Sequence, residues 1–278
     1  MEDVSVRVLL VTKGHPFARE PFLSIFDDAP GIEWTHVEQP AAEALLDPGA
    51  AARWDVLVFY DMPGIRFTGS DPPVELQAPP AALVRGFEAL LDAGKGMVFL
   101  HHAVAGWPAW PRYAEVIGAR FHYQPATLAG VEYPDSGYRF DVRHRVEVLD
   151  PGHPLCAGLG DGFELTDELY LFPVLRDDVV PLLRTTYDTT DASRFSSADL
   201  AVRGVRGSNE GWTHPPGSDL VGWVKHAGRS PIAYLQPGDG PVTYADPCFR
   251  RLLANAIGWA ASPEAHAWAR TRREAEQR

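Results

Sequence analysis

Apolar strand-like runs alternate with helix-like segments along the first hundred residues, and this alternation constrains the fold more than any other feature. Residues 4–11 and 55–60 are dense in aliphatic side chains, as strands covered on both faces are. Residues 81–93 place apolar side chains at helical spacing, and Gly94 precedes a further apolar run at 97–100. Short strand-to-helix connections favour parallel neighbours, so we predict an α/β fold with a doubly wound, mostly parallel sheet.

The remaining patterns predict one domain over residues 1–262, followed by a charged helical tail over residues 263–278. We expect an amphipathic helix at residues 246–261 to close the domain. The other expected elements are helices at 17–26, 41–52 and 107–117, strands at 32–37, 138–149, 179–186 and 231–235, and loops at 61–80, 123–138 and 188–218.

Charge and cysteine content narrow the expected partners. The formal net charge of -12 repels nucleic-acid phosphates and anionic lipid, so we expect a small-molecule ligand and neither a nucleic-acid nor a membrane partner. Cys156 and Cys248 are the only cysteines, which supports no disulfide framework and no cysteine metal site. With no secretory signal pattern at the start, we expect a cytoplasmic protein, and a homo-oligomer stays open.

Two adjacent histidines form the sharpest chemical signal. The apolar run 96–100 ends in His101 and His102, at the edge where open α/β sheets bind ligands. Adjacent residues on a continuing strand point to opposite faces, so we expect one imidazole to face the cleft, and we favour His102. The alternative is that His101 is a hydrogen-bonded core residue.

A second group of titratable residues follows the middle of the chain. Asp167 and Glu168 precede Leu169 and Tyr170, and His153 lies upstream. Carboxyl groups beside apolar and aromatic side chains gain a raised pKa suited to acid/base work, or they ligate a metal with histidines. The alternative for the acidic pair is a helix start or a loop cap.

Trp212 and His214 lie in a glycine- and proline-rich stretch that suits a polyhydroxylated ligand. An indole ring covers the apolar face of a sugar while polar groups bind its hydroxyls. The alternative is an ordered loop anchored by Trp212. No GxxxxGK[ST], strand-linked GxGxxG or GxSxG pattern occurs, which disfavours nucleotide phosphate binding and serine hydrolysis.

Taken in order, several of these segments resemble the ThuA-like, or trehalose-utilisation, family. The matching segments are residues 96–103, 110–113, 117–118, 153–154, 167–170, 230–235, 244–251 and 256–259. The resemblance implies a flavodoxin-like fold of the class I glutamine amidotransferase-like superfamily, and a role in the metabolism of sugars or keto-sugars.

The same resemblance places His102, or else His101, where glutamine amidotransferases carry a nucleophilic cysteine. An imidazole cannot form the glutamyl thioester, so we do not expect glutaminase activity. Family members commonly carry Gly-His near the last strand, whereas this chain has Gly238-Asp239-Gly240. Asp239 then stands in for that histidine as a base or a ligand.

Two functions follow from these residues. In the first, an enzyme of the hydrolase or the isomerase/lyase type acts on a carbohydrate, with His102, Glu168, Asp167 and Asp239 as catalytic groups. His102, Glu168 and His153 would hold a divalent metal such as zinc, if one is used. In the second, the chain is a non-catalytic sugar-binding or sensing module. The expected substrate-binding residues are His101, Trp107, Tyr170, Trp212 and His214.

Overall fold

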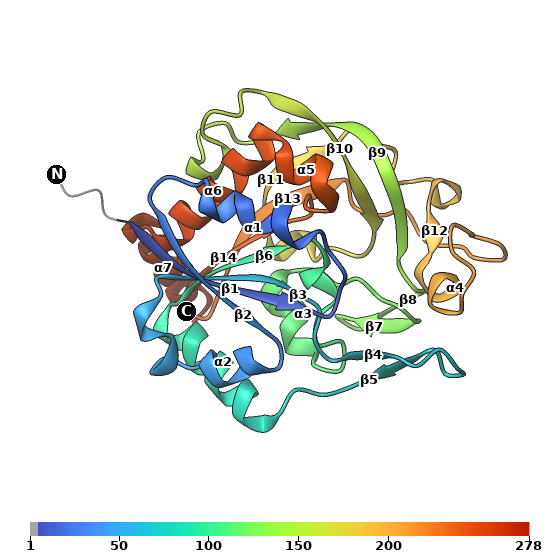
Figure 1. Cartoon of the computed structure of the whole chain (residues 1–278), viewed down its shortest axis with the longest axis horizontal. Coiled ribbons are helices and arrows are strands. Elements are labelled where there is room, and N and C mark those ends of the chain that lie inside the picture. Colours follow the sequence, from blue (N-terminus) through green and yellow to red (C-terminus); the bar gives the residue numbers. More distant parts are fainter. Residues whose placement is uncertain (1–4, 278) are drawn as a thin grey trace.

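A central parallel sheet with helices on both faces confirms the predicted α/β class (Figure 1). The computed structural model describes residues 5–277, so Val4 of the expected first strand lies outside the described residues. The parallel strands stand in the order β14-β6-β3-β1-β2, and their carboxyl ends meet at one edge. They are β1 (Val6–Lys13), β2 (Ile32–Glu38), β3 (Val56–Asp61), β6 (Gly96–Leu100) and β14 (Ser230–Leu235).

The second half of the sheet is antiparallel and continues from β14. Strands β13, β11, β9 and β10 follow in that order, and the short β12 pairs with β9. Three of these strands, β10, β12 and β13, were not predicted from the sequence, and β12 lies in the stretch 188–218 that was expected to be a loop. The bounds are β9 (Gly137–Val148), β10 (Gly162–Leu171), β11 (Val180–Thr185), β12 (Ser196–Ser197) and β13 (Leu220–Ala227).

Two apolar cores, one on each face of the sheet, hold the helices in place. Figure 1 shows α1, α5 and α6 together on one side, with α2 and α3 on the other. Helix α2 buries Leu83, Phe87, Leu90 and Leu91, which confirms the predicted stripe. The helices are α1 (Arg19–Asp27), α2 (Ala81–Ala93), α3 (Pro111–Ile117), α4 (Ala198–Val202), α5 (Gly240–Ala245), α6 (Pro247–Ala261) and α7 (Pro263–Glu276).

The prediction of a helix at residues 41–52 is wrong. Two short 3-10 turns, η1 (Ala41–Leu45) and η2 (Ala50–Arg53), take its place. The Asp47 side chain accepts hydrogen bonds from the backbone amides of Gly49 and Ala50, at 2.8 and 3.1 Å. Such a local bond competes with the helical ladder, and Pro48 cannot donate to that ladder.

Two expected loops contain small hairpins. The first consists of β4 (Ile65–Phe67) and β5 (Val74–Leu76), and the second of β7 (Ala126–Leu128) and β8 (Val131–Tyr133). The charged tail is helix α7, whose Ala265 and Ala269 are buried.

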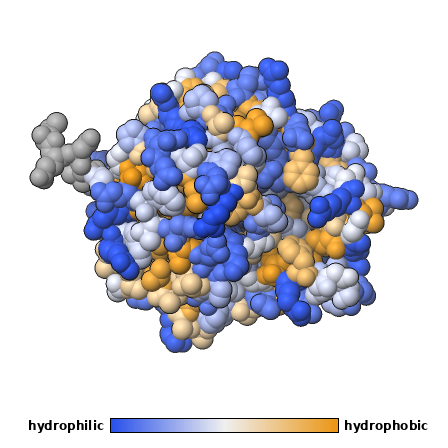
Figure 2. All heavy atoms as spheres, in the orientation of Figure 1, coloured by the Kyte–Doolittle hydropathy of each residue, from blue (hydrophilic) through white to orange (hydrophobic). Residues whose placement is uncertain are grey.

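The surface is mostly hydrophilic, with hydrophobic residues in small groups on the face drawn in Figure 2. Among residues 5–277, no helix combines the length and the apolar character that crossing a membrane requires.

His144 makes the stability of this fold dependent on pH. Its Nδ1 lies 2.8 Å from the Thr185 hydroxyl, and burial lowers its pKa to about 4. Between pH ~6.5 and ~4 the unfolded chain binds a proton that the folded chain does not, so the free energy of unfolding falls as the pH falls. The full effect is at most about 3 kcal/mol.

We expect the fall in unfolding free energy between pH ~6.5 and ~4 to be smaller in His144→Gln than in the wild type. Urea unfolding at several pH values measures it. His122, whose pKa burial also lowers to about 4, contributes a slope of the same sign, whereas Asp61 and Asp167, whose pKa burial raises to about 7, contribute the opposite sign; His144→Gln leaves all three unchanged. Equal slopes in the variant and the wild type would contradict the assignment to His144.

Candidate functional site

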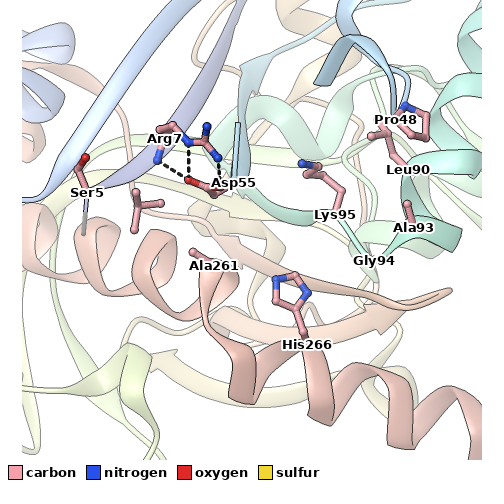
Figure 3. Close-up of a pocket in the computed structure, with 11 residues that line it drawn as sticks. Ser5, Arg7, Pro48, Asp55, Leu90, Ala93, Gly94, Lys95, Ala261 and His266 are labelled. Atoms are coloured by element: carbon pink, nitrogen blue, oxygen red, sulfur yellow. Dashed lines mark hydrogen bonds and ion pairs between the residues drawn. The ribbon is translucent and has the colours of Figure 1, made fainter. Parts of the chain in front are cut away.

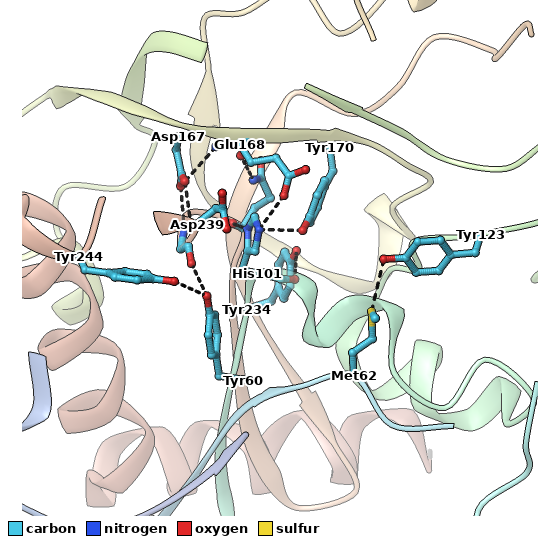
Figure 4. A network of polar contacts seen from close by, with 12 residues as sticks. Tyr60, Met62, His101, Tyr123, Asp167, Glu168, Tyr170, Tyr234, Asp239 and Tyr244 are labelled. Carbon is cyan, nitrogen blue, oxygen red and sulfur yellow. Dashed lines mark hydrogen bonds and ion pairs between the residues drawn. The ribbon is translucent and has the colours of Figure 1, made fainter. Parts of the chain in front are cut away.

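His101 lies at the carboxyl edge of the sheet, and both of its ring nitrogens make hydrogen bonds (Figure 4). Its Nδ1 donates to the backbone carbonyl of Gln236 at 2.7 Å. Its Nε2 lies 3.0 Å from Glu168 Oε2 and 2.7 Å from the Tyr170 hydroxyl, and the Tyr170 ring stacks on the imidazole. The side chain of His101 is fully buried, so these contacts take place without bulk water.

The backbone of His101 brings its ring to this position. Strand β6 ends at Leu100, and the chain enters the 3-10 turn η3 (His101–Ala105) with a φ of 47° at His101. A non-glycine residue in this left-handed region carries strain, which surrounding contacts must offset. The Tyr234 hydroxyl supplies one such contact, because it donates to the His101 carbonyl at 3.0 Å.

Burial and charge act in opposite directions on the pKa values of His101 and Glu168. Burial alone would lower the pKa of His101, but the hydrogen bond and charge of Glu168, with the charges of Asp167 and Asp239, raise it to about 9. Burial raises the pKa of Glu168, against the bond to His101. The His101 ring is therefore favoured as an imidazolium at neutral pH, with Glu168 as its acidic partner.

Asp167 supports the site through the backbone. Its carboxylate accepts from the amides of Gly238 at 2.7 Å and of Asp239 and Glu168 at 2.9 Å each. Burial raises the pKa of Asp167 to about 7, against the charge of His101 and these bonds. The side chain thus ties the loop after β14 to strand β10.

Asp239 completes the cluster on its open side. His101, Glu168 and Asp239 each offer a ligand atom, and these three atoms lie within 4.8 Å of one another. Asp239 is half-buried, whereas Glu168 is only 5% exposed. One imidazole nitrogen and two carboxylate oxygens form a donor set that suits a divalent transition-metal ion, and they equally suit proton transfer.

His102 has different surroundings from those favoured in the sequence analysis. Its Nε2 lies 3.2 Å from the Tyr60 carbonyl, its Nδ1 is buried without a partner, and its ring packs on Tyr60 and His15. The alternation argument does not hold here, because the strand ends before the two histidines and the chain turns at His101. It is therefore His101 that the structure brings to Glu168.

The other predicted residues lie in separate places. His153 begins the 3-10 turn η4 (Pro154–Cys156), accepts from the Leu155 amide at 3.1 Å and packs on Trp259. It is not in the group formed by His101, Glu168 and Asp239. Trp107 is buried against the loop at Gly64.

Trp212 and His214 lie together, with ring centroids 5.7 Å apart. The Trp212 indole donates to the Asp135 carbonyl at 3.2 Å, and the His214 Nδ1 donates to the Pro215 carbonyl at 2.7 Å. These bonds fit the loop-anchor alternative, since they hold the loop to its own surroundings.

Sequence reasoning missed two partners of His101, namely Gln236 and Tyr234, and it also missed His15. Gln236 additionally donates from its side chain to the Glu168 carbonyl at 2.7 Å. Both Gln236 and Tyr234 stand at the end of the strand expected at residues 231–235. That position at the carboxyl edge was the available signal.

A cavity of about 710 Å³ lies at the opposite end of the strands (Figure 3). Its charged groups already have partners: Arg7 pairs with Asp55 at 2.8 Å, and Lys95 donates to the carbonyls of Ala51 and Trp54. We assign no chemistry to this cavity.

Gly238 sets the spacing between Asp239 and His101. Its φ is 152°, and a Cβ added there would lie 3.1 Å from the His101 Cβ. We expect Gly238→Ala to lower the free energy of unfolding by ~1–3 kcal/mol, through backbone strain and pressure on His101. Gly240→Ala is the matched control, because Gly240 has a φ of 76° and open space around it. Denaturant unfolding measures both variants, and an equal loss would mean that contact with His101 adds nothing.

Comparisons with known proteins agree with the fold. A family model described as ThuA, trehalose utilisation, matches residues 7–260. A solved ThuA-like protein from Parabacteroides merdae is 14% identical at a TM-score of 0.66, and the match covers 93% of this chain and 90% of that one. One from Bacteroides uniformis is 17% identical at a TM-score of 0.57, over 92% and 91% of the two chains.

A cytoplasmic protein from Salmonella typhimurium is also similar, at 13% identity and a TM-score of 0.55, over 92% of this chain and 99% of that one. At such identities the similarity shows the fold alone. A search among curated proteins finds no match.

Proposed function

The chain belongs to the ThuA, trehalose utilisation, family, and we propose that it is an enzyme that acts on a sugar or keto-sugar by acid/base chemistry at His101, Glu168 and Asp239. The family supports a carbohydrate-related role. The observation that carries the enzymatic proposal is the fully buried His101–Glu168 pair at the carboxyl edge of the sheet. Burying such a pair is costly, and sites with perturbed pKa values concentrate at functional centres.

Asp239 supplies the carboxylate nearest to the open side of the cluster. In a keto-sugar, the C–H bond beside the carbonyl breaks when a base takes the proton, and the electron pair moves towards the carbonyl oxygen as an enolate. The buried imidazolium of His101 stabilises that negative charge, because the charge of His101 acts at low local dielectric. Protonation of the former carbonyl carbon, with the proton of the adjacent hydroxyl passing to the former carbonyl oxygen, gives isomerisation. Expulsion of a glycosidic oxygen on the carbon next to the carbanion, which takes a proton as it leaves, gives elimination.

His101, Glu168 and Asp239 would also hold a divalent metal, which would polarise the carbonyl when bound. The hydrogen bonds that the Gly238 and Asp239 backbone amides donate to the Asp167 carboxylate keep the Asp239 backbone in position with or without a metal. Elemental analysis of protein purified without a histidine tag distinguishes metal-assisted chemistry from proton transfer by the side chains alone. Near-stoichiometric metal in the wild type that is lost in Asp239→Asn would identify the cluster as a metal site. Active protein without metal would mean that the side chains alone transfer the proton.

We expect wild-type protein to convert the oxidised keto derivative of trehalose, and Asp239→Asn and His101→Gln to lower kcat/KM for it by ~10²–10⁴. Trehalose itself has no carbonyl beside which a proton could be removed, so it should not be converted. Chromatography of the products measures turnover. His153→Gln is the control and should stay within a few-fold of the wild type, because His153 packs on Trp259 away from the cluster.

Thermal unfolding of each variant confirms that it is folded. Binding of the disaccharide without any turnover in the wild type would instead support the sugar-binding module. Full activity in Asp239→Asn would contradict the assignment of the base.

A further inference from the structure

His15 lies beside the same cluster and packs against His102. It lies in the loop that follows β1, at the carboxyl edge of the parallel strands. Its ring stacks on His102 with centroids 4.5 Å apart and planes 25° apart. His102 directly follows His101, so this stack attaches the imidazole of His15 to the side of the site.

The loop geometry fixes His15 there. The Met62 amide donates to the Lys13 carbonyl at 2.8 Å, which joins the ends of β1 and β3. Gly14 has a φ of 96°, and a Cβ on it would lie 2.3 Å from the Met62 carbonyl oxygen. Only glycine permits this approach, so the position of His15 is set by backbone packing and not by a flexible loop.

His15 differs from His101 in accessibility. His101 is fully buried, while His15 is half-buried. Its Nδ1 is enclosed without a hydrogen-bond partner, and its Nε2 neither bonds to the described residues nor counts among the enclosed atoms. The Nε2 edge of His15 is therefore free to bind a ligand beside His102.

The charges around His15 favour a neutral ring. Burial lowers its pKa and the charge of His101 lowers it further, whereas the charge of Asp239 raises it. The unbonded Nε2 of His15 is a group that can pass a proton to or from a bound ligand.

We propose that His15 is a substrate-contacting proton-transfer group of this site, and that the buried His101–Glu168 pair acts behind it and Asp239. The proposal rests on the proposed function for its catalytic meaning. Its geometric part, a partly exposed imidazole stacked on His102, is independent of turnover. The proton passes between the substrate and His15 Nε2, and no further reactant is needed.

Diethyl pyrocarbonate, which modifies accessible neutral imidazoles, tests the geometric part. We expect peptide mass spectrometry of the folded protein to show His15 modified at least ~10-fold faster than His101 and His102. Saturating trehalose or its keto derivative should slow modification of His15 and leave that of half-buried His153 unchanged. Modification of His15 as slow as that of His101, or at a rate that neither sugar changes, would overturn the proposal.

The variant His15→Gln tests the catalytic part. We expect kcat to fall by ~10²–10⁴ with KM within a few-fold and an unchanged melting temperature, since glutamine keeps a polar side chain but cannot accept the proton. His153→Gln is the matched control. A wild-type kcat in His15→Gln would overturn the inference and leave the proposed function standing. Sugar protection of His15 without turnover in the wild type would overturn the proposed function and the proton-transfer role, and would leave only the contact between His15 and the ligand.

Discussion

The buried contact between His101 and Glu168 joins the two halves of the sheet. His101 follows the parallel strand β6, whereas Glu168 belongs to β10, the last strand of the antiparallel extension. Four strands separate β6 from β10 in the sheet order, yet the two side chains meet at 3.0 Å. The extension must therefore curve back over the carboxyl edge, as Figure 4 shows for the strand that carries Asp167 and Glu168.

Such a contact is costly to bury, which explains the density of hydrogen bonds around it. Removing a carboxylate and an imidazolium from water costs several kcal/mol each, and their attraction offsets this only when the remaining polar atoms are satisfied. Gln236 serves both partners, with its backbone carbonyl on His101 and its side-chain amide on the Glu168 backbone. The end of β14 thus fixes the distance between the ends of β6 and β10.

The parallel half of the fold was predictable from the sequence because each of its strands is covered on both faces. Burial on both faces requires continuous apolar runs, such as residues 55–60, and these runs are visible in the sequence. Strand β10 was not predictable in this way, since Asp167 and Glu168 interrupt its apolar pattern at the register shift in its pairing with β9. The helix expected at residues 41–52 failed because the local bonds of Asp47 outweighed the helix propensity of alanine and leucine.

In the site, as in the fold, the features set by local sequence were predictable and those set by long-range contacts were not. The sequence located the carboxyl edge and both histidines, but it did not predict the positive φ that turns His101 towards Glu168. The orientation of the His101 ring depends on hydrogen-bond partners that are distant in the sequence, namely Glu168, 67 residues away, and Gln236, 135 residues away. His15 is a lone histidine in a loop, with no spacing to mark it. Only the packing of Gly14 on Met62 brings it beside His102, so the proposed site can be recognised from the fold and not from any one sequence motif.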